Sequence, residues 1–283
     1  MAHDPYQLVQ KAHSIPSLPE IFYQLVAIID DPNVSLSDIS NVISEDTSLS
    51  ARLLRIANSA MFNFPSRINT ISQAITIIGT QQIRELVLAT SVISIFKGIS
   101  SDLVDMQSFW RHSIACGIAA RAIATLRRAG NIEQFYVLGL LHDIGLLLSV
   151  TLIPDKAKIA LTRCQQGGEL LYRVEREVLG FNHGGLGAAL LKAWRLPDAV
   201  QEPVGCHHSP TIASAYPEAA AIVHLAEIIV QGLSLGNSGE QWVSPLDQKA
   251  WRILALAEGS IATIVDILDQ QYMEAVRLFL TDV

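Results

Sequence analysis

The sequence predicts an all-α protein. Apolar residues recur at helical spacing along nearly all of the 283 residues, as expected for helices that bury one face. Residues that cap or end helices stand between these stretches, whereas alternating strand patterns are scarce. Half of the residues are apolar, so a chain of this length can bury a large core without disulfides or structural metals.

The N-terminal part, up to about residue 100, carries a series of short helical patterns. Ser17 is expected to cap the first helix, with Pro19 in its first turn. Ser35 and Asp38 form a capping-box pattern for the second. Gly79 is expected to end the fourth. The expected helices cover residues 17–29, 35–43, 46–58, 70–78 and 80–96.

The segment Lys97–Asp105 contains Gly, Ser and Asp and is taken as a boundary between two lobes. Helical patterns continue after it. The expected helices are Met106–Leu126, Ile132–Val150, Pro154–Gln166, Glu169–Leu179, His183–Trp194, Pro197–His207, Glu218–Gly232 and a final set from Ser244 to Thr281. We therefore divide the chain into an N-terminal helical lobe (1–100), a helical core (101–232) and a C-terminal helical extension (233–283).

The charge pattern argues against a nucleic-acid-binding protein. The chain has 27 acidic and 20 basic residues, and the basic ones form no long cluster, although nucleic-acid affinity depends on phosphate neutralisation. The stretch Ser35–Asn58 allows a helix-turn-helix interpretation, but only Arg52 and Arg55 offer basic groups for a recognition helix. We prefer ordinary helix packing for this stretch.

The sequence also argues against a membrane protein. The most apolar window, Tyr136–Ile153, contains His142 and Asp143 near its centre, and a central charge costs about 2.5–3.5 kcal/mol on insertion scales. The N-terminus lacks the pattern of a secretory signal. An odd number of widely spaced cysteines indicates free thiols and a cytoplasmic location. These are Cys116, Cys164 and Cys206.

The same apolar window holds the most informative residues. A carboxylate within a helix that is buried all round is strongly destabilising unless it is paired, hydrogen-bonded or bound to a metal. Asp143 and its neighbour His142 therefore need partners from elsewhere in the chain. The candidates are His112, His183, His207, His208 and Glu227. Histidine and carboxylate ligands suit Fe, Mn, Zn or Ni, and cysteine is not obviously part of this set.

Each candidate also has a structural interpretation. A single buried histidine is usually a hydrogen-bonded core residue, and both His183 and Asp143 could cap helices, with Asn182 as the N-cap before His183. His3 and His13 are expected to be structural or incidental. The same holds for His224, which could pair with Glu227 three residues later on one helix face.

These residues resemble a known pattern. His112, the pair His142–Asp143 and a later carboxylate resemble the H…HD…D pattern of the HD superfamily of metal-dependent phosphohydrolases. The N-terminal lobe resembles that of HDOD proteins, the HD-related output domain of bacterial signalling. The resemblance covers about residues 13–230. It is carried by the order of Ile15–Pro19, Ser44–Leu49, Leu53–Ser59, Ile71–Ile75, Ile78–Gly79, Phe109–Ser113, Gly139–Gly145, His183, Trp194–Pro197 and His207–His208.

The resemblance implies an HD-domain-like helical bundle with an N-terminal helical lobe, and a role as a signal-output or regulatory module. It implies a divalent metal site, with Asp143 as the catalytic residue if the protein is active. Compared with the cyclic di-GMP phosphodiesterases of the superfamily, the expected ligands are His112, His142, Asp143, His183, His207, His208 and Glu227, the last replacing an aspartate.

Three departures from that pattern weaken the expectation of hydrolysis. Ser108 stands where the family has a glutamate, and Leu146 stands where it has a lysine. Tyr216–Pro217 keeps only part of the family's Gly-Tyr-Pro segment. Losing a preorganised cation typically costs about 10²–10³ in rate. We therefore expect a signalling module with a degenerate, non-hydrolytic metal site. The alternative is a metal-dependent phosphohydrolase acting on a nucleotide or cyclic dinucleotide, with Arg111 as a candidate phosphate ligand.

The resemblance also sets the expected partners. These are signalling proteins, namely receiver, kinase or cyclic-nucleotide systems, while neither nucleic acid nor a membrane is expected. The high apolar content would also suit a homodimer or a docking surface.

Overall fold

The computed structural model describes residues 4–12, 15–59, 62, 64, 67–96 and 102–280. The described residues form helices joined by turns and loops, with no strand among them, which confirms the predicted all-α class. His3, His13 and the first part of the expected boundary segment, residues 97–101, lie outside the described residues.

The chain forms two compact units. The larger unit combines residues 1–15 with 99–268, and the smaller unit combines 16–98 with 269–283. Each unit therefore joins two separate parts of the chain, whereas the sequence-based division into 1–100, 101–232 and 233–283 follows the chain consecutively. The long helix α16 (Ser260–Leu280) begins in one unit and ends in the other.

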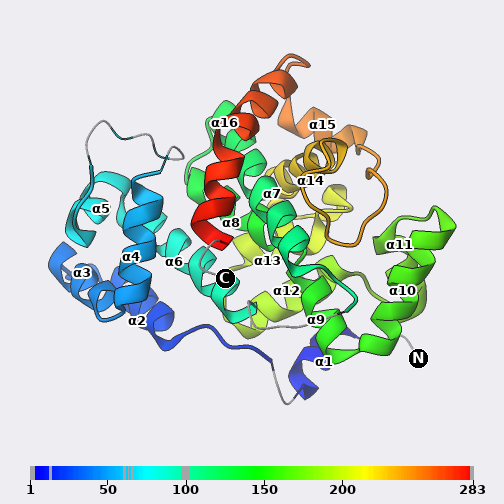
Figure 1. Cartoon of the computed structure of the whole chain (residues 1–283), viewed down its shortest axis with the longest axis horizontal. Coiled ribbons are helices and arrows are strands. Elements are labelled where there is room, and N and C mark those ends of the chain that lie inside the picture. The colour runs from blue at the N-terminus through cyan, green and yellow to red at the C-terminus, as the bar shows by residue number, and fades with distance from the viewer. Residues whose placement is uncertain are drawn as a thin grey trace. The chain divides into compact units, whose positions relative to one another are not determined.

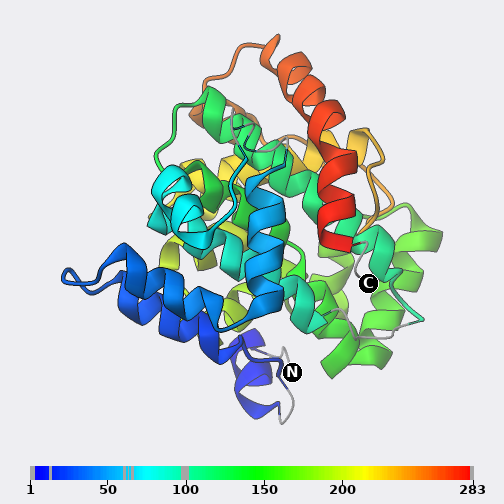
Figure 2. The ribbon, with the colours of Figure 1, turned by 60° about the vertical axis from the view of Figure 1, so that its left-hand side comes forward.

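The smaller unit contains α2 (Glu20–Ile29), α3 (Leu36–Ser44), α4 (Thr47–Ala57), α5 (Ile71–Ile78) and α6 (Thr80–Phe96). In Figure 2 the blue helices α2 and α3 lie side by side, and α3 also packs on α5. The core consists of the apolar stripes of these helices. Its fully buried members include Leu25, Ile39, Ile43, Leu53, Ile56, Ile75 and Ile83.

Local signals in this unit mostly act as expected. Ser35 and Asp38 form the predicted capping box, and Asp46 caps α4 through the amide of Leu49. Gly79 ends α5 with a φ of 102°, a value that favours glycine. The expectation for Ser17 is wrong, because α2 begins at Glu20 after Pro19 and has no side-chain cap. Arg52 on α4 hydrogen-bonds Ser94 on α6, consistent with ordinary helix packing.

The larger unit is a bundle around α7 (Met106–Leu126), which packs against α8 (Ile132–Leu141) and α14 (Pro217–Gly232) (Figure 1). The helix α12 (His183–Ala193) packs on α9 (Ile144–Leu152) and α13 (Asp198–Cys206). The remaining elements are α1 (Pro5–Lys11), α10 (Pro154–Gly167), α11 (Leu171–Leu179), the 3-10 turn η1 (Pro210–Ile212) and α15 (Gln248–Leu254).

Glycines allow the closest helix contacts in this unit. A Cβ at Gly139 of α8 would meet the carbonyl oxygen of Cys116 on α7. A Cβ at Gly145 of α9 would meet the carbonyl oxygen of His183 on α12. Because side chains are excluded at these two points, the backbones of four helices approach closely beside the residues singled out above.

The structure corrects one expected helix. The stretch 132–150 is not one helix but two, α8 and α9, which are separated by His142 and Asp143. His142 donates its Nδ1–H to the carbonyl oxygen of Gly139 at 2.8 Å, and the φ and ψ of Asp143 are −99° and 7°. The whole stretch Ile132–Leu152 is long and apolar enough to cross a membrane, but 83% of its most apolar window is buried inside the protein.

Candidate metal centre

The seven residues proposed as ligands lie together in one buried cluster of the larger unit. The pair His142–Asp143 lies between α8 and α9, and His207–His208 follows α13. None of the seven side chains is more than 5% exposed. The histidine–carboxylate cluster consists of His112 on α7, His142, Asp143, His183 at the first position of α12, His207, His208 and Glu227 on α14.

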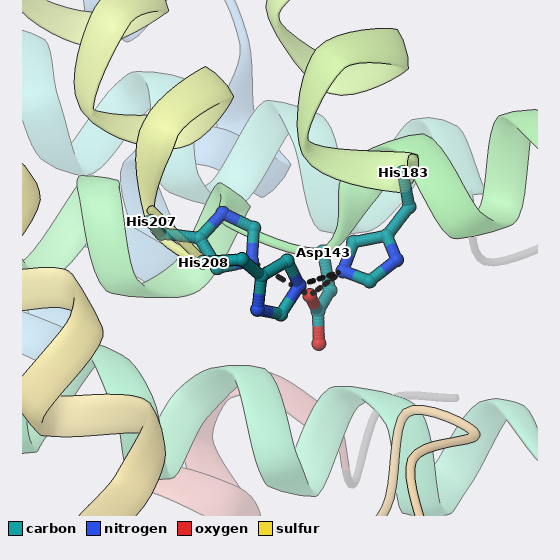
Figure 3. Close-up of side chains that lie close together, drawn as sticks. All are labelled: Asp143, His183, His207 and His208. Carbon is teal, nitrogen blue, oxygen red and sulfur yellow. Dashed lines mark hydrogen bonds and ion pairs between the residues drawn. The ribbon is translucent and has the colours of Figure 1, made fainter. Parts of the chain in front are cut away.

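Two helix breaks make this arrangement possible. Neighbouring residues within an α-helix point about 100° apart, so a continuous helix could not direct both members of a sequential pair into one site. Helix α8 ends at Leu141 and α13 ends at Cys206, each directly before one of the two pairs. Both members of each pair therefore reach the cluster, as Figure 3 shows for His207 and His208.

Asp143 lies at the centre of the cluster, and its two carboxylate oxygens face different histidines. Oδ1 lies 3.1 Å from Nε2 of His183 and 3.7 Å from Nε2 of His207. Oδ2 lies 3.0 Å from Nε2 of His142 and 3.6 Å from Nε2 of His112. Figure 3 shows His183 and the pair at the end of α13 converging on this carboxylate. One carboxylate thus joins two neighbouring groups of donor atoms.

Hydrogen bonds fix the tautomer of three histidines. Nδ1 of His142 lies 2.8 Å from the carbonyl oxygen of Gly139, and Nδ1 of His207 lies 2.6 Å from that of Val204. Because these acceptors require a proton on Nδ1, each Nε2 keeps its lone pair when the ring is neutral. His183 is oriented in the same way by a carboxylate. This arrangement is typical of metal-binding histidines.

Several buried polar atoms of the cluster have no hydrogen-bond partner. Buried polar groups are nearly always hydrogen-bonded, and an unsatisfied one costs about 1–3 kcal/mol. The atoms are Nε2 of His142, Oδ1 of Asp143, Nε2 of His207, Nδ1 of His208 and Oε2 of Glu227. The first two make the ionic contacts of 3.0 and 3.1 Å described above. Two overlapping sets have donor atoms within 4.8 Å of one another: Asp143, His183, His207 and His208, and His142, His207 and Glu227. The donor set and the unsatisfied atoms fit a divalent metal.

The histidines of the cluster differ in the direction in which their surroundings shift the pKa. Burial lowers the pKa of His112 to about 4, and burial together with neighbouring histidines holds the pKa of His207 and His208 well below the ordinary value. For His183 burial lowers the pKa, but the carboxylates of Glu175 and Asp143 together outweigh it and raise the pKa. Burial and Asp143 raise the pKa of Glu227 to about 8.

Glu175 on α11 is part of the site, although the sequence analysis did not identify it. Its Oε2 lies 2.6 Å from Nδ1 of His183 and also accepts the backbone N–H of His183 at 2.8 Å. The side chain is 1% exposed. A signal was available, because Glu175 lies midway between Leu171 and Leu179 on the apolar face of an amphipathic helix. Tyr172 was also missed; its ring stacks on His208 with centroids 4.3 Å apart.

Two further residues behave differently from expectation. His224 does not pair with Glu227; its Nδ1 lies 2.8 Å from the carbonyl oxygen of His207, and its Nε2 accepts the N–H of Asp247. Its structural role therefore includes holding the backbone of a cluster residue. Cys116 lies beside the cluster, with its Sγ 3.5 Å from Nε2 of His112.

A segment after α14 covers part of the cluster. Gly236 packs against the backbone of α7, and the N–H of Asn237 donates to the carbonyl oxygen of Ser108. Leu146 is buried and lies near Gly239. A cavity of about 260 Å³ between His112 and this segment is lined by residues 231–232, 234, 236–238 and 240–243. No lysine or arginine is among those lining residues.

Comparisons with known proteins agree with this fold. The HDOD domain family matches residues 15–210. A protein of Treponema pallidum (strain Nichols), described only as uncharacterized, is 26% identical over 239 residues, which is 83% of this chain. The chain spans only 45% of the length of that relative.

Solved structures share the fold over nearly the whole chain. An HDOD domain protein with unknown function from Geobacter sulfurreducens is 23% identical, with 98% of this chain and 97% of the other covered and a TM-score of 0.80. A protein of Shewanella amazonensis SB2B, provisionally described as a phosphohydrolase, is 24% identical, with 96% and 97% covered and a TM-score of 0.76.

A third structure, from Marinobacter aquaeolei VT8 and provisionally described as a signal transduction protein, is 20% identical. The similarity covers 94% of this chain and 60% of that one, with a TM-score of 0.73. These likenesses show the fold. Together with a family match over more than half of the 283 residues, they confirm the resemblance drawn from the sequence: the chain belongs to the HDOD family.

Proposed function

We propose that this chain is a cytoplasmic output or regulatory module of bacterial signal transduction that carries a degenerate divalent metal centre and does not hydrolyse phosphodiesters. Family membership supports the signalling role, and the Marinobacter structure bears a name of that kind. The expected partners are receiver, kinase or cyclic-nucleotide signalling proteins.

The observation that carries the metal centre is the set of buried donor atoms without hydrogen bonds. Asp143 would be the central ligand, because its two oxygens face different histidines. His183, His207 and His208 would complete one position, and His142 and His112 lie on the other side. Fe, Mn, Zn or Ni suits such a set. A divalent cation in this position would activate water and hold a phosphate oxygen.

The observation against hydrolysis is the lack of cationic side chains around the cavity beside His112 and at position 146. The cavity that reaches His112 is lined by the carboxylate of Glu240 and by no lysine or arginine. Leu146, at the family's lysine position, is 2% exposed and packed among apolar neighbours. Without such a preorganised cation the developing phosphate charge loses stabilisation worth about 10²–10³ in rate.

The second candidate function, a metal-dependent phosphohydrolase for a nucleotide or cyclic dinucleotide, is favoured by the central position of Asp143 between two groups of histidines. Two adjacent metals are the arrangement used for in-line phosphoryl displacement. Asp143 would then be the catalytic residue, and the Shewanella structure bears a corresponding name.

One assay separates the two functions. Tag-free protein is loaded with Mn²⁺ and incubated with a chromogenic phosphodiester and with cyclic dinucleotides, beside an Asp143→Asn variant prepared in the same way. We expect no rate above that of the variant. A rate that Asp143→Asn abolishes would contradict the regulatory proposal and establish the phosphohydrolase.

A further inference from the structure

We propose that Cys116 is a sulfur ligand of the metal centre and forms, with His112 and His142, a position that contains a thiolate. The proposal rests on the metal centre proposed above and changes its chemistry, since the expected ligand set contained only nitrogen and oxygen. The donor atoms of these three residues lie within 4.8 Å of one another.

The first argument is the position of the sulfur. Cys116 follows His112 by one turn of α7, so the two side chains lie on the same face of the helix. Its Sγ lies 3.5 Å from Nε2 of His112, and the residue is fully buried. Bonds of about 2.3 Å to sulfur and 2.0–2.1 Å to nitrogen at a tetrahedral metal place the two donors about 3.5 Å apart. The observed separation matches this value.

The second argument is the unsatisfied nitrogen opposite the sulfur. Nε2 of His142 is buried and has no hydrogen-bond partner, while its Nδ1 is held by the carbonyl oxygen of Gly139. Oδ2 of Asp143 lies 3.0 Å from this Nε2 and 3.6 Å from Nε2 of His112. Two nitrogens and one sulfur, with this carboxylate oxygen beside them, would hold the metal.

The backbone at Cys116 is also fixed. The contact between α7 and α8 is so close that a Cβ at Gly139 would collide with the carbonyl oxygen of Cys116. The backbone that carries the sulfur is therefore fixed by the packing of two helices. The other cysteines differ. Cys164 faces the carbonyl oxygen of Glu169, and Cys206 is only partly buried; neither belongs to a metal-ligand group among the described residues.

A Cys116 thiolate bound to metal and a Cys116 thiol hydrogen-bonded to His112 predict different chemistry. On metal binding the thiol of Cys116 would lose its proton to solvent, and the thiolate would bond the metal. In the alternative, the thiol donates to Nε2 of His112 and makes no bond to metal. A thiolate ligand also raises the affinity of the site for Zn²⁺, Co²⁺ and Fe²⁺ relative to its affinity for Mn²⁺.

The test uses Co²⁺ as a spectroscopic probe in the full-length chain. Metal-free protein is reconstituted with Co²⁺, and bound cobalt is counted by elemental analysis. The near-ultraviolet spectrum is then recorded for the sulfur-to-cobalt charge-transfer band. We expect this band in the wild type and in the matched controls Cys164→Ser and Cys206→Ser, and its complete loss in both Cys116→Ser and Cys116→Ala.

The outcomes distinguish this proposal from the one on which it rests. Bound cobalt without the band, or a band that persists in both Cys116 variants, overturns the thiolate and leaves the metal centre standing. No bound cobalt in folded wild type overturns both. If neither Cys116 variant folds, a band that is present in the wild type and in both control variants still assigns the sulfur to Cys116, because the chain has three cysteines. A second readout is the ratio of Zn²⁺ to Mn²⁺ affinity, which Cys116→Ser should lower at least about tenfold.

Discussion

At the scale of residues, side chains that lie behind the cluster hold its members in place by hydrogen bonds. Glu175 accepts both the ring N–H and the backbone N–H of His183, and Gln231 donates to Oε1 of Glu227 at 2.8 Å. The histidines of the cluster could be found from the sequence because an HD pair interrupts an apolar run. Glu175 could be found only by placing it on the buried face of its helix.

Removing Glu175 should weaken metal binding without removing a ligand. In Glu175→Ala, His183 loses the acceptor that orients its ring, and loss of such a partner typically costs 10–100-fold in metal affinity. Glu175→Gln, which keeps one acceptor oxygen, should lose less. Competition titration with a chromophoric chelator measures both affinities.

The control for this prediction lies on the same helix. Glu177 is 58% exposed and bonds Arg163 away from the cluster, so Glu177→Ala should leave the metal affinity unchanged. Equal affinities in the Glu175→Ala variant and the wild type would show that the carboxylate does not orient His183.

Glu202 fixes the loop that follows the double histidine. Its carboxylate accepts the N–H groups of Ser214, Ala215 and Tyr216. Burial raises its pKa, but these hydrogen bonds outweigh it and lower the pKa. A lowered pKa means that the carboxylate stabilises the fold above its unfolded-state pKa, and that this stabilisation is lost as the pH falls through the folded-state value.

Glu202→Gln should therefore lower the free energy of unfolding by about 1 kcal/mol at neutral pH, a value reduced from that of a buried charged hydrogen bond because solvent screens it. The difference from wild type should vanish in acid, below the ordinary pKa of glutamate. Urea unfolding at a series of pH values measures it, with Glu258→Gln at an exposed position as the control. A difference that is independent of pH would refute the role of the charge.

At the scale of elements, the helix breaks and the close contacts between helices could not be predicted from the sequence. Periodicity predicted one helix over 132–150, because apolar residues continue through His142 and Asp143. The break arises from tertiary contacts and from the side-chain bond of His142 to Gly139, which a repeating pattern does not contain. Capping signals at Ser35, Asp46 and Asn182 act within one turn and were readable from the sequence.

The contact between α9 and α12 should not tolerate a methyl group. In Gly145→Ala the added Cβ would collide with the carbonyl oxygen of His183, and overpacking of this kind typically costs about 1–3 kcal/mol. Because the collision displaces a cluster histidine, metal affinity should fall as well. Gly232→Ala, where nothing lies within 4 Å of the added Cβ, is the matched control. Wild-type stability and metal binding in Gly145→Ala would contradict the close contact.

At the scale of the whole molecule, the histidine–carboxylate cluster belongs to one of two compact units. All seven proposed ligands lie within residues 99–268, and none comes from residues 16–98. The sequence resemblance identified the family from ordered motifs, but it could not show that each unit combines distant segments of the chain. That property depends on where α1 and the end of α16 pack, and neither helix carries a distinctive motif.

Metal binding should therefore stabilise the two units unequally. A ligand at 100 times its dissociation constant adds about 2.7 kcal/mol to the state that binds it. Hydrogen exchange by mass spectrometry should show greater protection of α7, α8, α12 and α14 in metal-loaded protein than after chelation. Helices α2–α6 should exchange at the same rate in both samples. Uniform protection of both units, or none, would disagree with a centre confined to the larger unit.

The most direct test of the central claim is the metal content of the purified chain. Tag-free protein, prepared without added metal, is analysed by inductively coupled plasma mass spectrometry beside His142→Ala. We predict at least one equivalent of Fe, Mn, Zn or Ni per chain in the wild type and a loss of metal in the variant. Folded wild-type protein that contains none of these metals, and takes up none on reconstitution, would contradict the account.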